Sequence, residues 1–118
     1  MKWWTTLCFD LVVVLAFATI GRLSHGEAAD PGGIVNTAWP FVVALIGTTG
    51  ILIGLQRPTE LVTNGALVWV GTLVFGMWIR ARSGDGVQVS FVIVAGVFLV
   101  LCMLGWRLLA ARRAHAAR

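Results

Sequence analysis

The sequence predicts an all-α polytopic membrane protein, folded as a bundle of four transmembrane helices. Four apolar segments, residues 7–23, 37–56, 61–80 and 87–109, are separated by short polar connections. Each is close to the roughly 20 residues that cross a hydrocarbon core about 30 Å thick. The chain is 58% hydrophobic and 12% charged, about half the charge of a typical soluble domain. Residues 1–109 are therefore predicted to form one transmembrane domain, followed by a basic cytoplasmic tail over 110–118.

The first segment, 7–23, has two interpretations. Lys2 precedes it and small residues follow at 25–29, a pattern that resembles a cleaved signal peptide. The segment is longer than a typical signal-peptide core, however, and it contains the acidic residue Asp10. We therefore favour a retained membrane helix.

Helix boundaries follow from capping and breaking residues. Asn36 or Thr37 is predicted to cap the second helix, with Pro40 in its first turn, where no backbone N–H is needed. The glycines and proline between residues 26 and 33 are expected to keep the preceding loop irregular, so that it can fold over the mouth of the bundle.

The two later connections are short, so the last three helices are expected to be antiparallel neighbours. Pro58 and Thr59 are expected to open the third helix. Asp85 and Gln88 have the spacing of a capping box for the fourth.

Topology is predicted from the positive charges. A cytoplasmic N-terminus puts six bases inside and three outside: Lys2, Arg57, Arg107, Arg112, Arg113 and Arg118 against Arg22, Arg80 and Arg82. This agrees with the positive-inside bias and predicts a multi-pass protein of the cell membrane with both termini in the cytoplasm. The basic tail is expected to contact the lipid bilayer, through anionic lipid, rather than nucleic acid.

Small residues indicate where helices approach one another. Candidate packing positions are Gly47, Gly50, Gly54, Gly71 and Gly76. Because helices in lipid associate through close contact, glycines favour these positions. We expect the GxxxG pair at 50 and 54 to pack inside one chain, and a homodimer seam is the alternative.

Asp10 is the most informative polar residue. A carboxylate one turn inside a membrane helix is costly unless it is paired or protonated. Arg107, Arg57 and Asn64 lie near the same depth, and we expect Arg107 to be its partner. The alternative is a titrating carboxylate in a proton or cation pathway.

A second polar cluster is predicted at the opposite end. Arg22 and Arg80 end the first and third helices there, with His25 and Trp39 nearby. The two arginines are expected to form a basic pocket for an anionic group. The alternative is that they extend to the interface and are neutralised by the acidic first loop. His25 is interpreted as a hydrogen-bonded loop residue.

Several short motifs in order carry a family resemblance. They are Asp10, Gly-Arg-Leu-Ser-His (21–25), Thr-Ala-Trp-Pro-Phe (37–41), Gly65 with Val68-Trp69, Thr72 with Gly76-Met77 and Arg80, Ser-Phe-Val (90–92), and Gly-Trp-Arg (105–107). Over residues 10–107 the chain resembles the domain-of-unknown-function family three-zero-five-four, small actinobacterial four-helix membrane proteins. The resemblance implies that Asp10, Arg22, His25, Trp39, Pro40, Arg80, Trp106 and Arg107 belong to the family pattern. It carries no assigned activity.

No catalytic motif, metal-ligand cluster or cofactor signature is present in the sequence, and its two cysteines are too few for a disulfide framework. We therefore expect no enzyme activity, no metal and no cofactor. The prediction is a non-enzymatic structural or accessory membrane protein. The alternative is a small homodimeric transporter or channel that uses Asp10 and the pocket of Arg22 and Arg80.

Overall fold

A computed structural model describes residues 2–24 and 26–116, and these form four helices. They are α1 (Trp3–Ser24), α2 (Pro31–Gly54), α3 (Val62–Arg82) and α4 (Val89–Ala116). All four are long and apolar enough to cross a membrane. The predicted class, an all-α multi-pass membrane protein, is confirmed.

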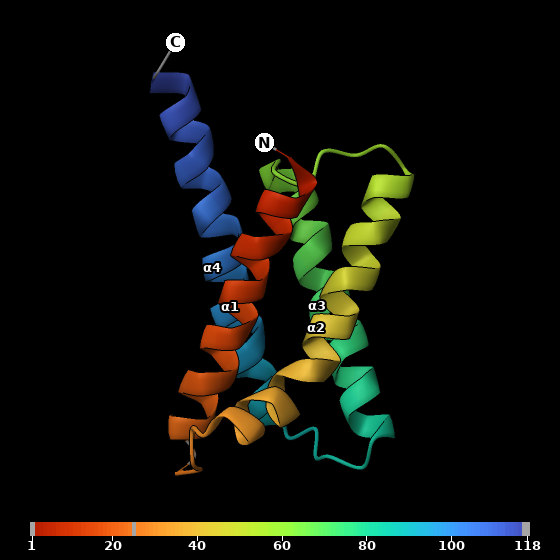
Figure 1. The fold of residues 1–118 in the computed structure, drawn as a ribbon, viewed down its shortest axis with the longest axis vertical. Helices are drawn as coiled ribbons and strands as arrows, with labels where there is room; N and C mark the ends of the chain where they lie inside the picture. Colours follow the sequence, from red (N-terminus) through yellow and green to blue (C-terminus); the bar gives the residue numbers. More distant parts are fainter. Residues whose placement is uncertain (1, 25, 117–118) are drawn as a thin grey trace.

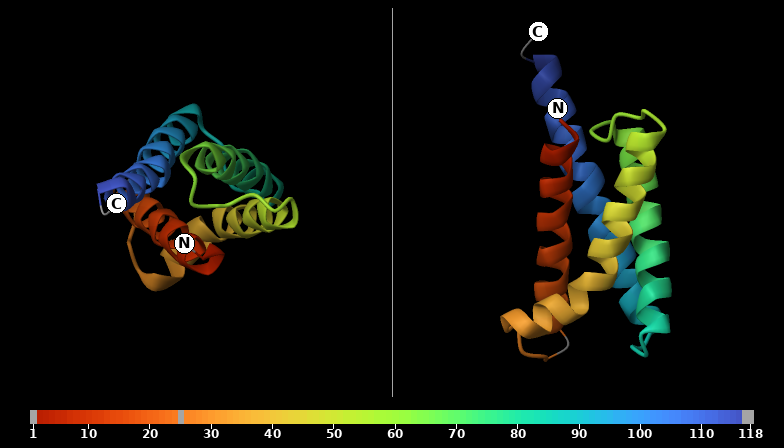
Figure 2. Two further views of the ribbon diagram at one scale, coloured as in Figure 1. Left: turned by 90° about the horizontal axis from the view of Figure 1, so that it is seen from above. Right: turned by 45° about the vertical axis from the view of Figure 1, so that its right-hand side comes forward.

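The helices surround one core, and each packs against two neighbours in the cyclic order α1, α2, α3, α4. The end-on view in Figure 2 shows this ring. The predicted neighbours α2, α3 and α4 are adjacent and antiparallel (Figure 1). The start of α1 and the end of α4 lie at the same end of the bundle, as four crossings require. We refer to it as the terminal end.

Aromatic and aliphatic side chains fill the centre of the ring. Phe17 and Phe41 are fully buried and meet edge to face, with ring centroids 5.4 Å apart. Phe91 of α4 packs against Phe17 at 5.6 Å, so α1, α2 and α4 share one aromatic cluster. Edge-to-face contact and close dispersion packing hold helices together where lipid provides no hydrophobic driving force.

The start of α2 differs from the prediction. The helix begins at Pro31, and Asn36 and Thr37 lie inside it instead of capping it. Asp30 is the N-cap, and its carboxylate accepts a 3.3 Å hydrogen bond from the Gly33 backbone N–H. The glycines before residue 34 were read as helix breakers, but proline at the first helical position and an Asp cap are strong start signals.

Pro40 therefore lies inside α2 rather than in its first turn. A proline inside a helix removes one backbone hydrogen bond and bends the helix. In Figure 1 the first turns of α2 cross the end of the bundle obliquely, and the rest of the helix runs along the bundle axis. Helix, instead of the irregular loop we expected, crosses this mouth.

The starts of α3 and α4 also need correction. α3 begins at Val62 with Leu61 in the N-cap position, so Pro58 and Thr59 belong to the preceding turn. α4 begins at Val89, which leaves Asp85 a full turn too early for a capping box. In both places a polar residue in the connection was mistaken for the cap.

The predicted tail is mostly helix. α4 continues to Ala116 and projects beyond the other helices at the terminal end (Figure 1). Leucine, alanine and arginine after Trp106 are strong helix formers, and no glycine or proline stops the helix. Arg112 and Arg113 are exposed on this extension, while residues 117–118 lie outside the described part of the chain.

The packing glycines divide into two groups. Gly71 and Gly76 of α3 face α2 so closely that a Cβ would collide with Thr48 and Phe41, respectively, which confirms them as packing positions. Gly47, Gly50 and Gly54 are exposed, with nothing within 4 Å of an added Cβ. The expectation that the GxxxG pair packs inside one chain was therefore wrong, because α2 turns that face away from its neighbours.

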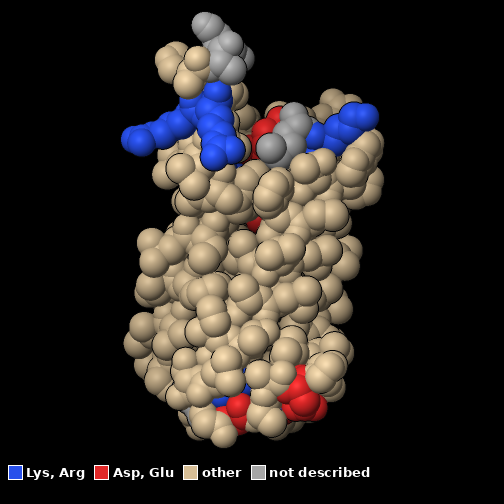
Figure 3. All heavy atoms as spheres, turned by 60° about the vertical axis from the view of Figure 1, so that its left-hand side comes forward, with Lys and Arg blue, Asp and Glu red and all other residues tan. Residues whose placement is uncertain are grey.

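The surface agrees with a membrane environment. Charged side chains gather at the two ends, and a broad uncharged band separates them (Figure 3). Large apolar residues of the helices, such as Val12, Ile51 and Leu101, are more than half exposed. In a bilayer these side chains contact lipid.

Candidate functional site: an arginine pocket opposite the terminal end

The molecule has two polar centres, and the first is a buried ion pair between α1 and α4. Arg107 binds Asp10 with both terminal nitrogens: Nη2 donates to Oδ2 at 2.7 Å and Nη1 to Oδ1 at 3.0 Å. Trp106 donates its indole N–H to the same Oδ1 at 2.9 Å. The Arg107 side chain is 0% exposed and that of Asp10 is 1% exposed. The prediction that Arg107 is the partner of Asp10 is confirmed.

The rest of the Arg107 guanidinium is also satisfied. Nε donates to the Thr59 carbonyl oxygen and Nη1 to the Met103 carbonyl oxygen, both at 2.9 Å. Gly65 makes room for the side chain, because a Cβ there would lie 2.5 Å from Arg107 Cδ. Arg107 thus joins α1, α3, α4 and the connection between α2 and α3.

The other predicted partners of Asp10 form a separate contact. Arg57 donates from Nη1 to the Asn64 side-chain oxygen at 3.2 Å. Asn64 in turn donates to the Pro58 carbonyl oxygen at 2.7 Å. These bonds stabilise the turn between α2 and α3.

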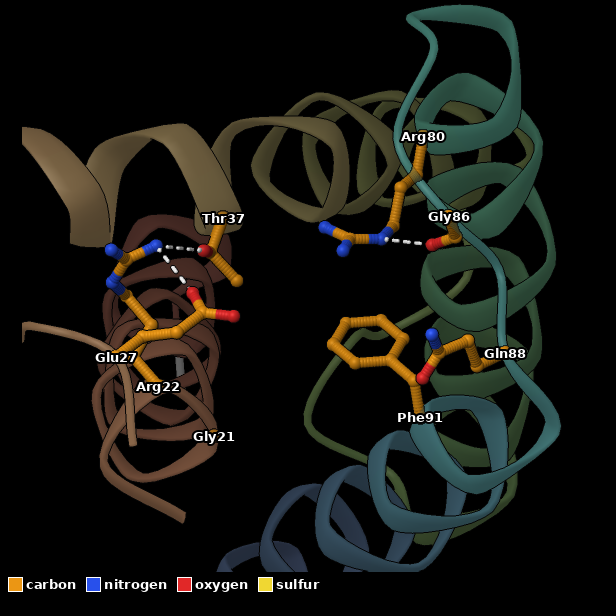
Figure 4. Close-up of a pocket in the computed structure, with 8 residues that line it drawn as sticks. All are labelled: Gly21, Arg22, Glu27, Thr37, Arg80, Gly86, Gln88 and Phe91. Atoms are coloured by element: carbon orange, nitrogen blue, oxygen red, sulfur yellow. Dashed lines mark hydrogen bonds and ion pairs between the residues drawn. The ribbon is translucent and has the colours of Figure 1, made fainter. Parts of the chain in front are cut away.

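The second polar centre is a pocket at the end opposite the termini, and it is our candidate functional site. Its volume is about 370 Å³. Eight residues from all four helices and two connections line it: Gly21, Arg22, Glu27, Thr37, Arg80, Gly86, Gln88 and Phe91. Figure 4 shows Arg22 and Arg80 on opposite sides of this space. The structure therefore brings the two predicted arginines to one pocket.

Arg22 is held by the connection that follows α1 and by α2. Nε donates to the Ala28 carbonyl oxygen at 2.5 Å, and Nη1 donates to Thr37 Oγ1 at 3.2 Å. Nη1 also lies 3.1 Å from Glu27 Oε2, in an ion pair. Gly33 lets the guanidinium approach α2, because a Cβ at that position would be 2.6 Å from Arg22 Cζ. The glycine that we interpreted as a helix breaker is needed here for space.

Arg80 is oriented differently. Its Nε donates to the Gly86 carbonyl oxygen at 2.8 Å, and its Cζ lies 4.3 Å from the centroid of the Phe91 ring. These contacts fix the plane of the guanidinium, and Figure 4 shows the terminal nitrogens pointing into the pocket. Within the described ranges, no carboxylate lies within ion-pair distance of Arg80.

The structure places one of the two remaining candidates, Trp39, outside this pocket. Trp39 is 38% exposed and is not among the lining residues that the structure describes. His25 lies outside the described residues. Across residues 2–24 and 26–116, no group of three or more His, Cys, Asp or Glu side chains is placed to hold a metal ion.

Sequence reasoning missed several lining residues. Thr37 was taken as a helix cap, and Phe91 and Gln88 were not considered as pocket residues. Trp106 was named only as part of the family pattern, whereas it binds Asp10. The adjacent Trp106 and Arg107 in one motif were a usable signal for a shared partner.

The fold and its polar centres define a four-helix multi-pass membrane protein. It has a buried ion pair between α1 and α4 and an arginine-lined pocket at one end. Residues 7–110 match the family model described as "Protein of unknown function (DUF3054)". The match spans most of the chain, so the chain belongs to this family, and the resemblance noted in the sequence is confirmed. Neither the curated proteins nor the solved structures gave a match.

Proposed function

We propose that this protein is a non-catalytic membrane component that binds a small anionic group in the pocket between Arg22 and Arg80. The observation that carries the proposal is the state of Arg80. Its guanidinium is fixed by Gly86 and Phe91 and points into open space with no carboxylate partner among the described residues. A fixed guanidinium binds carboxylate or phosphate oxygens through paired N–H donors.

The size and composition of the pocket support a ligand. Its volume, about 370 Å³, is within the range of roughly 300–1,000 Å³ typical of small-molecule sites. Gln88 adds an amide, and Phe91 provides an apolar wall. The site can therefore hold a polar group attached to a short apolar portion.

We also propose the orientation of the protein in the cell membrane. Of the Lys and Arg residues that the structure describes, five lie toward the terminal end: Lys2, Arg57, Arg107, Arg112 and Arg113. Three lie toward the other end: Arg22, Arg80 and Arg82. The positive-inside bias favours a cytoplasmic terminal end. The pocket then opens at the outer face, and Arg112 and Arg113 lie where they would meet anionic lipid of the inner leaflet.

The buried ion pair supports an accessory role over proton-coupled transport. Both oxygens of Asp10 already accept hydrogen bonds from Arg107, and Oδ1 accepts a further one from Trp106. A carboxylate that carries protons or cations has to exchange hydrogen-bond partners. Both oxygens of Asp10 are instead occupied by buried donors. Asp10 is better explained as a structural tie than as part of a pathway.

Association with a second copy is a separate proposal. Gly47, Gly50 and Gly54 leave an exposed strip on α2, and small residues at such positions favour helix–helix contact in lipid. Crosslinking in native membranes tests it. Gly50→Leu should abolish a dimer that uses this face and leave any other dimer intact.

The anion-binding proposal is tested by calorimetric titration of the purified protein in maltoside micelles. Dimethyl phosphate, acetate and sulfate serve as probes. Arg80→Gln should weaken binding of the preferred probe by tenfold or more, since a hydrogen bond to a charged group contributes about 1.5–3 kcal/mol. Arg82→Gln is the matched control, because Arg82 ends the same helix but lies over Trp78, outside the pocket. Equal binding by wild type and Arg80→Gln would refute the proposal.

A further inference from the structure

We infer that the pocket is selective for a singly charged oxyanion, a phosphodiester or a carboxylate, and that Glu27 sets this selectivity. The inference rests on the proposed function, since it names the class of anion that the same site takes. It follows from the charges of the lining residues and from the way the ion pair between Arg22 and Glu27 is held.

The lining residues carry one net positive charge. Arg22 and Arg80 contribute two positive charges and Glu27 contributes one negative charge, and the other five lining residues are uncharged. A singly charged occupant therefore neutralises the pocket. A doubly charged occupant leaves one excess negative charge beside Glu27, unless that side chain moves away.

Both the backbone and the side chain of Glu27 are held by Arg22. Its backbone N–H donates to the Arg22 carbonyl oxygen at 2.8 Å, which closes the turn after α1. Its carboxylate meets Arg22 Nη1 at 3.1 Å, while Arg22 Nε is bonded to the Ala28 carbonyl of the same connection. The loop and the arginine thus hold each other in a compact unit at the end of α1.

The Glu27 side chain is open to solvent. It is 56% exposed, so water reaches the carboxylate. It can repel a second negative charge in the pocket without being buried itself. Like charges close together are unfavourable, and this is a general means of rejecting the wrong ligand.

Across the pocket, Arg80 provides the recognition. Its Nε is used by Gly86, so its terminal nitrogens provide the donors for the ligand. Two oxygens that share one negative charge are common to a carboxylate and a phosphodiester, and they suit a guanidinium edge. Gln88 and Phe91 flank this position (Figure 4). Arg80 therefore binds the anion, and Glu27 limits the charge that the bound anion can carry.

The test compares probes of one and two charges on the wild type and on Glu27→Gln. Calorimetry in maltoside micelles, which contain no phosphate, measures dimethyl phosphate, acetate and sulfate. The wild type should bind at least one of the singly charged probes more tightly than sulfate. Glu27→Gln should raise sulfate affinity relative to that probe by about tenfold, on the scale of one charge-assisted interaction.

Asp30→Asn is the matched control. It removes a negative charge from the same connection, but Asp30 does not line the pocket, and asparagine retains the N-cap of α2. It should leave the ratio of the two affinities unchanged. A change equal to that of Glu27→Gln would mean that general loop charge sets selectivity, which overturns the inference.

The remaining outcomes separate the two proposals. If sulfate binds the wild type at least as tightly as both singly charged probes, and Arg80→Gln loses this binding, the inference is overturned. The proposal of an anion site then stands. Absence of binding by all three probes overturns both. The source of the anion is distinguished in nanodiscs of phosphatidylglycerol. A lipid headgroup occupant lowers the apparent affinity for the soluble probe relative to micelles, and a soluble occupant does not.

Discussion

Removing the Asp10 carboxylate should strongly destabilise the bundle. In Asp10→Ala, Arg107 keeps its charge at a position that is 0% exposed and loses two hydrogen bonds, of 2.7 and 3.0 Å. Breaking a buried ion pair from one side costs about 3–5 kcal/mol. Trp106 loses its acceptor as well, so we expect the upper part of this range. The free energy of unfolding is measured by SDS titration in mixed micelles.

Asp10→Asn distinguishes a structural tie from a proton carrier. Asparagine has the same shape, but it is neutral and turns an NH₂ group toward one of the Arg107 or Trp106 donors. A structural tie predicts clear destabilisation of this variant too. A proton-coupling carboxylate predicts normal folding with loss of a pH-dependent ligand response. If both variants unfold with a free energy within about 0.5 kcal/mol of the wild type, the usual range for surface substitutions, the structural role of Asp10 is refuted.

The double replacement Asp10→Leu with Arg107→Met supplies the control for this reasoning. Replacing both members of a buried pair by apolar residues of similar size is often close to neutral. The Thr59 carbonyl would still lose its donor, so some loss of stability remains. We expect the double variant to be more stable than Asp10→Ala. A double variant as unstable as the sum of the single changes would contradict an interaction between the two residues.

Two other predictions concern packing and topology. Gly65→Ala should cost about 1–3 kcal/mol, the typical penalty of overpacking, since its Cβ would lie 2.5 Å from the buried Arg107 side chain. Gly47→Ala, with nothing within 4 Å of the new Cβ, should be as stable as the wild type in the same SDS titration, and equal losses in both would contradict the account of Gly65. Cysteines placed at Ser83 and Ala116 should react from opposite sides of the cell membrane, Ser83 from outside, and the reverse pattern would overturn the proposed orientation.

The sequence was informative where lipid makes a residue type costly. Asp10 inside an apolar segment requires a partner, and Arg107 is the base at a matching depth in the last helix, so the pair was predictable. Arg22 and Arg80 end two helices at the same side of the membrane, which predicts one basic region. Four long apolar segments determine the fold class for the same reason.

Local geometry and tertiary packing were less predictable. The glycine at position 33 was interpreted as a breaker, but it lies inside α2, where its missing side chain leaves room for the Arg22 guanidinium. Gly50 and Gly54 have a packing spacing, yet the direction in which α2 faces depends on the bend at Pro40 and on its neighbours. A spacing shows which residues share a helix face, and only the packed bundle shows what that face meets.

Site-resolved NMR of the arginine Nε–H groups tests the central claim most directly. Arg80 and Arg22 are assigned by their loss in Arg80→Gln and Arg22→Gln, and the singly charged probe preferred in calorimetry is titrated into the wild type in maltoside micelles. We predict saturable shifts of the Arg80 and Arg22 signals, with Arg107, buried in its ion pair, unchanged. The exposed Arg112 should change weakly and without saturation. Signals of Arg80 and Arg22 that stay fixed, or that move no more than that of Arg112, would contradict an anion site in this pocket.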